Sequence, residues 1–278
     1  MRLLLARRVL CGVVLALGVV ACAPSVPAQH DGQHDSEQTD QGVGHAGSLP
    51  HLRPEVIRVL PHDRSSFTQG LEVSDGTLYE GTGLRGESLL RATDLATGQV
   101  RREVRLPGDL FGEGITVTGD RIWQLTWQEG VALERDRETL AELRRVEYSG
   151  EGWGLCFDGT RLVMSDGSDR LTFRDPATFA PTGSVEVRAE GSPVEELNEL
   201  ECVDGQVWAN VWRSDQIVRI DPASGQVTAV VDASGLLSPQ QRAGTDVLNG
   251  IAAVPGTDEF LLTGKLWPAV FRVRFVPA

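Results

Sequence analysis

A turn signal that recurs along most of the 278-residue chain constrains its fold more than any other feature. Short runs of alternating apolar and polar residues separate the turns, and no stretch keeps helical periodicity over the length of a helix. Measured from glycine to glycine, the turns are 43, 40, 46 and 51 residues apart, at Asp75-Gly76, Gly119-Asp120, Asp158-Gly159, Asp204-Gly205 and Gly256-Thr257-Asp258. Repeats of about 40 to 50 residues with four short strands are typical of β-propeller blades.

The segments that precede these turns align with one another, at Gln69-Gly70-Leu71, Glu113-Gly114-Ile115, Trp153-Gly154-Leu155, Asn198-Glu199-Leu200 and Asn249-Gly250-Ile251. Five units are visible, so we predict an all-β fold, a five-bladed β-propeller over residues 51–278. The last unit shows only three strands. We expect a strand over residues 55–60 to join that blade and close the ring, because closure removes an exposed edge. Residues 236–242 are expected to form a short helical insertion.

The repeat places polar and aromatic residues at equivalent positions. The starts of the innermost strands form a first ring, and the following strand of each blade supplies a second. Because the two strands are antiparallel, both rings should open on one face. Each residue type also has a purely structural interpretation. A tryptophan in a strand usually packs between blades, as we expect for Trp123 and Trp208. A glutamate can be a solvated charge at the rim, and an asparagine can form a turn. Their convergence favours a small-ligand pocket. The rings are Gln69, Glu113, Trp153, Asn198 and Asn249, and Gly83, Trp127, Gly167, Trp212 and Lys265.

Composition narrows the chemistry of such a pocket. The formal net charge of -13 opposes binding to a phosphate backbone, so nucleic acid is not an expected partner. His51 and His62 are the only histidines of the predicted domain, so we expect neither a His-activated nucleophile nor a zinc site, and we predict no metal ligands. Lys265 is the one lysine among 26 basic residues. Beside Glu113 in an aromatic cleft, it suits proton transfer combined with stabilisation of an oxyanion.

The N-terminal residues predict export and a lipid anchor. Three arginines precede a short apolar run over residues 9–21, which is typical of a secretion signal rather than a spanning helix. The run ends Val19-Val20-Ala21-Cys22, which resembles the lipobox of bacterial lipoproteins and implies lipidation of Cys22 after cleavage. An ordinary signal peptide cut elsewhere is the alternative. Because Ala23 and not an aspartate follows the cysteine, we expect anchoring at the outer membrane, on the periplasmic face of the bacterial cell envelope.

Three domains follow from this pattern: a lipoprotein signal peptide over residues 1–21, a lipid-anchored flexible linker over 22–50, and the catalytic propeller over 51–278. The linker is polar and has too little apolar surface to offset its ordering entropy. It contains His30, His34 and His45, which could bind a metal weakly, although a solvated linker is the simpler interpretation.

The motifs of the two rings resemble those of glutaminyl-peptide cyclotransferases of the plant and bacterial type. The resemblance spans residues 67–268, in order, at Phe67-Thr68-Gln69-Gly70-Leu71, Phe111-Gly112-Glu113-Gly114-Ile115-Thr116, Trp153-Gly154-Leu155, Leu197-Asn198-Glu199-Leu200-Glu201, Val207-Trp208-Ala209-Asn210-Val211-Trp212, Asp246-Val247-Leu248-Asn249-Gly250-Ile251-Ala252 and Thr263-Gly264-Lys265-Leu266-Trp267-Pro268. It implies a five-bladed propeller that converts N-terminal glutamine to pyroglutamate and releases ammonia. A departure is Gly112, where some relatives carry a larger residue.

The resemblance also implies roles for individual residues. Glu113 matches the catalytic glutamate and Lys265 the site lysine. The expected substrate-binding residues are Phe67, Gln69, Phe111, Trp127, Trp153, Asn198, Trp212 and Asn249. The expected partners are peptides or proteins with N-terminal glutamine and, through Cys22, the membrane, and the protein is expected to be a monomer. No cofactor is required, although the central channel could hold a structural divalent ion.

Two other functions stay open from the residues. One is a metal-dependent propeller lactonase or hydrolase that uses Glu and Asn around a cation. The other is a non-catalytic binding module of the cell envelope. The cysteines of the domain are expected to be free buried thiols. Cys156 aligns with Glu72 and Thr116, whereas Cys202 aligns with Val73 and Val117, so the offset of one residue points the two side chains to opposite faces of the pleat.

Overall fold

The structure is a computed structural model that describes residues 48–278. The predicted signal peptide, Cys22 and nearly all of the predicted linker lie outside the described residues. Within the described range, no helix combines the length and apolar character needed to cross a membrane.

The described residues form an all-β fold, as the turn pattern predicts. Three antiparallel four-stranded sheets follow one another along the chain. The first sheet contains β2 (Thr68–Ser74), β3 (Thr77–Thr82), β4 (Leu89–Asp94) and β5 (Val100–Arg105). The second contains β6 (Gly112–Thr118), β7 (Arg121–Thr126), β8 (Val131–Asp136) and β9 (Glu142–Glu147). The third contains β10 (Leu155–Phe157), β11 (Leu162–Met164), β12 (Arg170–Arg174) and β13 (Pro181–Glu186).

The remaining long strands form a composite eight-stranded sheet. Its order is β16-β17-β18-β19-β1-β22-β21-β20. β1 pairs antiparallel with β22 from Leu52 to Pro61 and parallel with β19 at His51 and Leu52, so residues 55–60 pair with the last unit as expected. The bounds are β1 (His51–Pro61), β16 (Leu197–Val203), β17 (Gln206–Val211), β18 (Gln216–Ile220), β19 (Val227–Asp232), β20 (Leu248–Ala253), β21 (Glu259–Gly264) and β22 (Ala269–Pro277).

Two short elements complete the chain. β14 (Arg188–Ala189) and β15 (Ser192–Pro193) form a small hairpin. α1 (Pro239–Arg242) confirms the helical insertion expected over residues 236–242. Ser238 caps it, since its hydroxyl accepts a hydrogen bond from the Gln241 amide and the Gln241 side chain accepts one from the Ser238 amide.

Three of the five predicted turns are two-residue hairpins, those between β2 and β3, β6 and β7, and β16 and β17. Asp75 and Gly76 connect β2 to β3 with φ of 47° and 70°, and Asp204 and Gly205 connect β16 to β17 with φ of 51° and 72°. Two successive positive φ values match the right-handed twist of the flanking strands, and Asp-Gly adopts them at little cost. These dipeptides therefore determine where the innermost strand of the repeat ends and the next strand begins.

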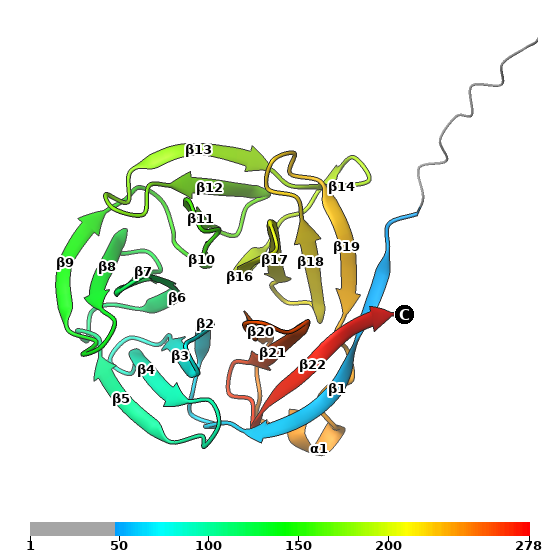
Figure 1. The fold of residues 1–278 in the computed structure, drawn as a ribbon, viewed down its shortest axis with the longest axis horizontal. Coiled ribbons are helices and arrows are strands. Elements are labelled where there is room, and N and C mark those ends of the chain that lie inside the picture. Colours follow the sequence, from blue (N-terminus) through cyan, green and yellow to red (C-terminus); the bar gives the residue numbers. More distant parts are fainter. Residues whose placement is uncertain (1–47) are drawn as a thin grey trace, which may run out of the picture. The chain divides into compact units, whose positions relative to one another are not determined.

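The sheets are arranged around a common centre, with β2, β6, β10, β16 and β20 innermost (Figure 1). Each of these strands contacts the next, and β20 contacts β2. Apolar side chains fill the space between neighbouring sheets. Trp123 and Trp208 belong to this packing, as expected, with 0% and 6% of their surface exposed. The Trp123 ring lies 4.8 Å from that of Phe179, which follows β12 in the third sheet.

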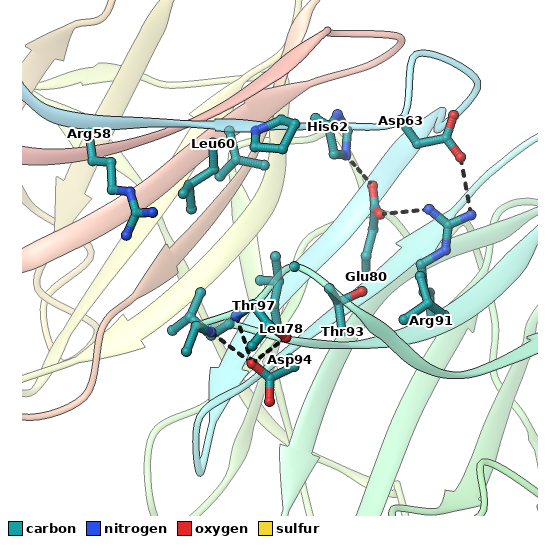
Figure 2. A pocket seen from close by; sticks show the side chains of 16 residues that line it. Arg58, Leu60, His62, Asp63, Leu78, Glu80, Arg91, Thr93, Asp94 and Thr97 are labelled. Atoms are coloured by element: carbon teal, nitrogen blue, oxygen red, sulfur yellow. Dashed lines mark hydrogen bonds and ion pairs between the residues drawn. The ribbon is translucent and has the colours of Figure 1, made fainter.

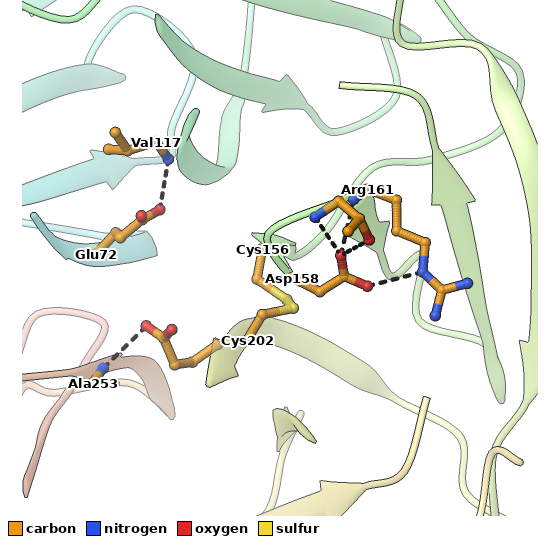
Figure 3. Close-up of a disulfide and its surroundings, with 9 residues drawn as sticks. Glu72, Val117, Cys156, Asp158, Arg161, Cys202 and Ala253 are labelled. Atoms are coloured by element: carbon orange, nitrogen blue, oxygen red, sulfur yellow. Dashed lines mark hydrogen bonds and ion pairs between the residues drawn. A yellow bond between two sulfur atoms is a disulfide. The ribbon is translucent and has the colours of Figure 1, made fainter. Parts of the chain in front are cut away.

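The expectation of free thiols is wrong: Cys156 and Cys202 form a disulfide (Figure 3). Their Cα atoms are 5.4 Å apart, within the range of protein disulfides. Cys156 lies in β10 and Cys202 in β16, which are neighbouring innermost strands. Neighbouring sheets pack face to face, so residues that meet between them come from opposite faces of their own sheets. The one-residue offset that seemed to separate the thiols therefore brings them together.

Adjacent residues confirm this arrangement. Leu155 packs in the core between the second and third sheets, whereas Cys156 packs in the core between the third sheet and β16–β19. On β16, Leu200 and Cys202 face that same core, and Glu201 points the other way, toward Ala253 of β20.

Carboxyl groups link the innermost strands to one another. Each accepts a hydrogen bond from a backbone amide of a neighbouring strand: Glu72 from Val117 at 2.7 Å, Glu201 from Ala253 at 3.0 Å, and Glu199 from Leu71 at 3.1 Å and Ile251 at 2.7 Å (Figure 3 shows the first two). Burial raises the pKa of Glu72 to about 7 and holds those of Glu199 and Glu201 well above their usual range. These side chains therefore serve as acceptors that hold the centre of the fold together.

Candidate active site

Four of the five first-ring residues lie at an irregularity in the pairing of the innermost strand. The pairing of the innermost strand shifts between Thr68 and Gly70, between Gly112 and Ile115, between Leu197 and Leu200, and between Leu248 and Ile251. Each interval contains one first-ring residue: Gln69, Glu113, Asn198 or Asn249. A bulge of this kind bends the strand and re-aims a side chain. In four of the five repeats, the innermost strand thus turns one polar side chain out of the ordinary alternation.

The second ring lies beside the first, as the antiparallel register predicts. In four repeats, its residue donates a backbone hydrogen bond to the carbonyl two positions before the first-ring residue. The pairs are Gly83 to Phe67, Trp127 to Phe111, Trp212 to Glu196 and Lys265 to Val247. The two rings therefore share one end of these sheets.

Glycines of the second ring leave room for aromatic side chains. A Cβ atom added to Gly83 would overlap the Phe111 ring, and one added to Gly167 would lie 2.7 Å from the Trp153 ring. Gly167 also has a φ of 84°, which disfavours other residues. The two glycines thus allow the rings of neighbouring residues to lie flat across the backbone.

A buried chain of polar groups connects three first-ring residues. Gln69 Nε2 donates to Glu113 Oε1 at 2.9 Å, and Asn249 Nδ2 donates to Gln69 Oε1 at 3.1 Å. All three side chains are buried, with Glu113 only 4% exposed. Gln69 is held from both sides, so it fixes the orientation of the Glu113 carboxyl.

Lys265 shares this environment with Glu113. Its ammonium lies 4.8 Å from the centre of the Phe67 ring, and the residue is 5% exposed. Burial raises the pKa of Glu113 well above its usual range, which the Lys265 charge opposes and the charges of Glu129 and Glu151 reinforce. Burial likewise lowers the pKa of Lys265, against the pull of Glu113 and Asp246. Both shifts favour the neutral forms, because burial penalises the charged form of either group.

Five aromatic side chains of the predicted site form two sets of contacting rings. Phe67 meets Phe111 edge-on at 6.2 Å between centroids, and Phe111 lies 5.5 Å from Trp127. Trp153 meets Trp212 edge-on at 5.3 Å. These five residues are the aromatic members of the predicted substrate-binding set.

Asn198 is the predicted site residue with the fewest connections to the others. It is buried, its backbone carbonyl accepts a hydrogen bond from the Ser165 hydroxyl at 2.7 Å, and its Oδ1 has no hydrogen-bond partner among the described residues. No hydrogen bond joins it to Glu113 or Lys265 within residues 48–278. The structure thus places Asn198 at the equivalent bulge, without a hydrogen bond to the acid or the lysine among the described residues.

Glu151 is a site residue that the sequence reasoning missed. Its Oε2 accepts hydrogen bonds from both Trp127 Nε1, at 2.7 Å, and Trp153 Nε1, at 3.0 Å. It lies in the loop before β10, outside the strand positions that define the rings. Its place two residues before Trp153 was the only available signal.

A separate cavity of about 430 Å³ lies between β1 and the first sheet (Figure 2). None of the predicted site residues lines it. It contains two ion pairs: His62 lies 2.9 Å from Glu80, and Arg91 lies 3.3 Å from Asp63. Burial alone would lower the pKa of His62, but the hydrogen bond to Glu80, the charges of Glu80 and Asp63 and the hydrogen bond to the Trp267 carbonyl together outweigh burial and raise it.

The Glu80 network supports the candidate site from outside. Glu80 also accepts a hydrogen bond from the Thr68 hydroxyl at 2.8 Å, and His62 Nδ1 donates to the Trp267 carbonyl at 2.8 Å. Thr68 precedes Gln69, and Trp267 follows Lys265 by two residues. The network therefore fixes the two segments that carry these site residues.

A resident metal would need a suitable set of donors. Within residues 48–278, no three or more His, Cys, Asp or Glu side chains are grouped so that they could hold a metal ion. The central carboxyls Glu72, Glu199 and Glu201 are instead hydrogen-bonded to backbone amides. Those hydrogen bonds engage acceptor oxygens of all three carboxyls.

Comparison with known proteins identifies the family. The sequence model of a family described as glutamine cyclotransferase matches residues 28–275. A glutaminyl-peptide cyclotransferase from Arabidopsis thaliana is 40% identical over 230 residues, which cover 81% of this chain and 72% of the relative. The crystal structure of Myxococcus xanthus glutaminyl cyclase matches with a TM-score of 0.75 and 40% identity, covering 83% of this chain and 100% of that one. The chain therefore belongs to the glutamine cyclotransferase family.

Proposed function

We propose that this protein is a glutaminyl-peptide cyclotransferase, an acyltransferase that converts the N-terminal glutamine of peptides and proteins to pyroglutamate with release of ammonia. The observation that carries the proposal is the buried Glu113 carboxyl, oriented by Gln69 and coupled to the charge of Lys265 among aromatic side chains. The names of the relatives in Arabidopsis and Myxococcus support the same activity.

The reaction is an intramolecular acyl transfer. The substrate's α-amine attacks its own γ-carbonyl carbon, which forms the new C–N bond and a tetrahedral oxyanion. Glu113 accepts the proton that the amine loses and delivers one to the departing nitrogen, so the old C–N bond breaks and ammonia leaves. Lys265 or Asn198 stabilises the oxyanion. Folding of the glutamine side chain onto its own amine supplies the proximity, and no covalent enzyme intermediate is needed.

The aromatic residues bind and shape the substrate in this proposal. Phe67, Phe111, Trp127, Trp153 and Trp212 enclose the glutamine side chain and exclude water, while Gln69 and Asn249 hold the Glu113 carboxyl in place. Exclusion of water strengthens the electrostatic interactions between the reacting groups and the protein.

Glu113→Gln tests the role of the proton carrier. We expect ammonia release from a peptide with N-terminal glutamine to fall by about 10²–10⁴-fold, the usual contribution of a positioned acid–base group. Glu147→Gln is the matched control, because Glu147 is exposed on β9. Mass spectrometry follows the loss of ammonia, and an N-acetylated peptide, which lacks the nucleophile, should not react. Near-wild-type turnover by Glu113→Gln would exclude this role.

Metal independence is part of the proposal, since the proton transfer and the oxyanion are assigned to side chains. Activity should persist after treatment with a chelator. Loss of activity that zinc or calcium restores would favour the metal-dependent hydrolase instead. A protein that binds the peptide without turnover would be the non-catalytic binding module.

The fold is proposed to be a five-bladed propeller with the composite sheet as its last two blades and β1 as the closing strand. The contact of each innermost strand with the next, and of β20 with β2, supports this arrangement. The domain boundaries at residues 21, 50 and 278 belong to the same proposal, as does a monomeric state, which size-exclusion chromatography with light scattering tests.

Lipid anchoring through Cys22 is proposed from the sequence motif alone, together with an outer-membrane location facing the periplasm. Metabolic labelling with a radioactive fatty acid tests it. The wild-type chain should incorporate the label and Cys22→Ala should not. Release of the unlabelled wild-type protein in soluble form would instead support an ordinary signal peptide.

A further inference from the structure

Glu151 links two tryptophans that come from different sheets. Trp127 follows β7 of the second sheet, and Trp153 precedes β10 of the third. One oxygen of the carboxylate accepts both indole N–H groups, at 2.7 and 3.0 Å, and the other accepts the Gln128 amide at 3.0 Å. Tryptophan can only donate from this nitrogen, so an acceptor between the two rings fixes both orientations.

We infer that Glu151 is a positioning residue of the active site, which holds Trp127 and Trp153 in the orientation that receives the glutamine side chain. The inference rests on the proposed cyclotransferase function and assigns a residue that neither the ring register nor the family motifs had singled out.

The contacts of the two indoles carry this orientation further. Trp153 meets Trp212 edge-on at 5.3 Å with an interplanar angle of 83°, and Trp127 lies 5.5 Å from Phe111. A rotation of either indole about its side-chain torsions would break one of these contacts. Glu151 thus connects the two aromatic sets that otherwise have no hydrogen bond between them within residues 48–278.

Glu151 is suited to this task as an anion. Burial alone would raise its pKa, but the hydrogen bonds from Gln128, Trp153 and Trp127 outweigh burial and lower it. A carboxylate offers several lone pairs and no donor, so it can accept all three hydrogen bonds at once. A glutamine at this position keeps one acceptor oxygen, whereas an alanine keeps none.

The charge of Glu151 also reaches the proposed proton carrier. Together with Glu129 it raises the pKa of Glu113 by unfavourable interaction between negative charges. Glu129 accepts hydrogen bonds from the Arg85 guanidinium and, at 3.5 Å, from the Phe111 backbone amide, but from no indole. Substitution of Glu129 therefore removes a negative charge near Glu113 without removing an indole hydrogen bond, whereas substitution of Glu151 by alanine removes both.

Four variants of the full chain test the inference: Glu151→Ala, Glu151→Gln, Glu129→Gln and, as surface control, Glu147→Gln. For a peptide with N-terminal glutamine, we expect Glu151→Ala to raise KM at least about tenfold, since displacement of a bound group by about 1 Å can cost up to 10²-fold. Glu151→Gln should recover most of that loss. Both Gln variants at 129 and 151 should move the acidic limb of the kcat/KM profile to lower pH, because removal of an anion lowers the pKa of Glu113.

Near-UV circular dichroism and tryptophan emission report the indoles without turnover. Both spectra should change in Glu151→Ala and stay wild-type in Glu129→Gln and Glu147→Gln. An unchanged spectrum and KM in a folded Glu151→Ala would overturn the inference, and so would failure of Glu151→Gln to recover KM relative to Glu151→Ala. If the wild-type enzyme releases no ammonia, the proposed function fails, and the spectra still decide whether Glu151 orients the indoles.

Discussion

Removal of the Cys156–Cys202 disulfide should cost this protein a large part of its stability. The bond closes a loop with a sequence separation of 46 residues. In the chain-entropy treatment, a loop of that length corresponds to about 4 kcal/mol at 25 °C, and typical measured values are about 2–4 kcal/mol. For a domain of this size, 4 kcal/mol corresponds to a decrease in Tm of about 8–16 °C. The effect arises from the unfolded state, because the cross-link limits the conformations that the segment from β10 to β16 can adopt.

Thermal unfolding with and without a reductant measures this contribution. The wild-type protein should lose stability on reduction, whereas Cys156→Ala/Cys202→Ala should melt at the lower temperature under both conditions. Peptide mapping under non-reducing conditions should recover the peptides of Cys156 and Cys202 joined to each other. Recovery of both as free thiols, or a wild-type Tm that reductant does not change, would refute the argument that adjacent sheets present opposite faces to each other.

Three further outcomes follow from the geometry. Gly83→Ala should raise KM by about tenfold, because its Cβ would displace Phe111; Gly108→Ala, where the nearest atom lies at 3.9 Å, is the control in the same peptide assay. Glu72→Gln should be more stable than wild type by about 1–3 kcal/mol at pH 8 but not at pH 4. The pKa of Glu72, raised to about 7, makes the protonated carboxyl favour the folded state at low pH, and this contribution is lost as pH rises from 4.5 through 7. Equal urea midpoint differences at both pH values would contradict this. His62→Gln should lose most stability near pH 5–6 and little at pH 9, because the raised pKa of His62 contributes stability below 6.5 that disappears as pH rises through the folded value. Melting curves across this pH range check it.

The positions that the sequence could predict are those that the repeat determines. Alternation and Asp-Gly turns specify where each sheet begins, and antiparallel pairing then places Trp127 and Trp212 level with Glu113 and Asn198. The backbone hydrogen bonds of the second ring follow that register in four repeats. Local backbone preferences and strand direction are sufficient for this part of the structure.

Two features depend on packing between sheets and could not be predicted from one repeat. To predict the disulfide, one must know which face of β10 packs against which face of β16. Periodicity within a strand tells only which of its residues share a face, not which neighbouring sheet that face contacts. Glu151 lies in a loop, and its importance depends on two indoles from different sheets that meet at its carboxylate. The bulges at Gln69 and Glu113 could not be predicted either, because a pairing irregularity leaves no trace in the alternation of apolar residues.

The use of basic residues in this chain has a physical logic. All but one of its 26 basic residues are arginines, and many of those form ion pairs at the periphery, as Arg91 does with Asp63 and Glu103. Arginine keeps its proton under all ordinary conditions, so it suits permanent ion pairs, whereas a buried lysine can lose its proton. Burial lowers the pKa of Lys265 and raises that of Glu113, so the two groups approach each other in acidity. In the proposed reaction an arginine could stabilise the oxyanion, but its permanent charge would also hold Glu113 ionised and so oppose the return of its proton to the leaving nitrogen.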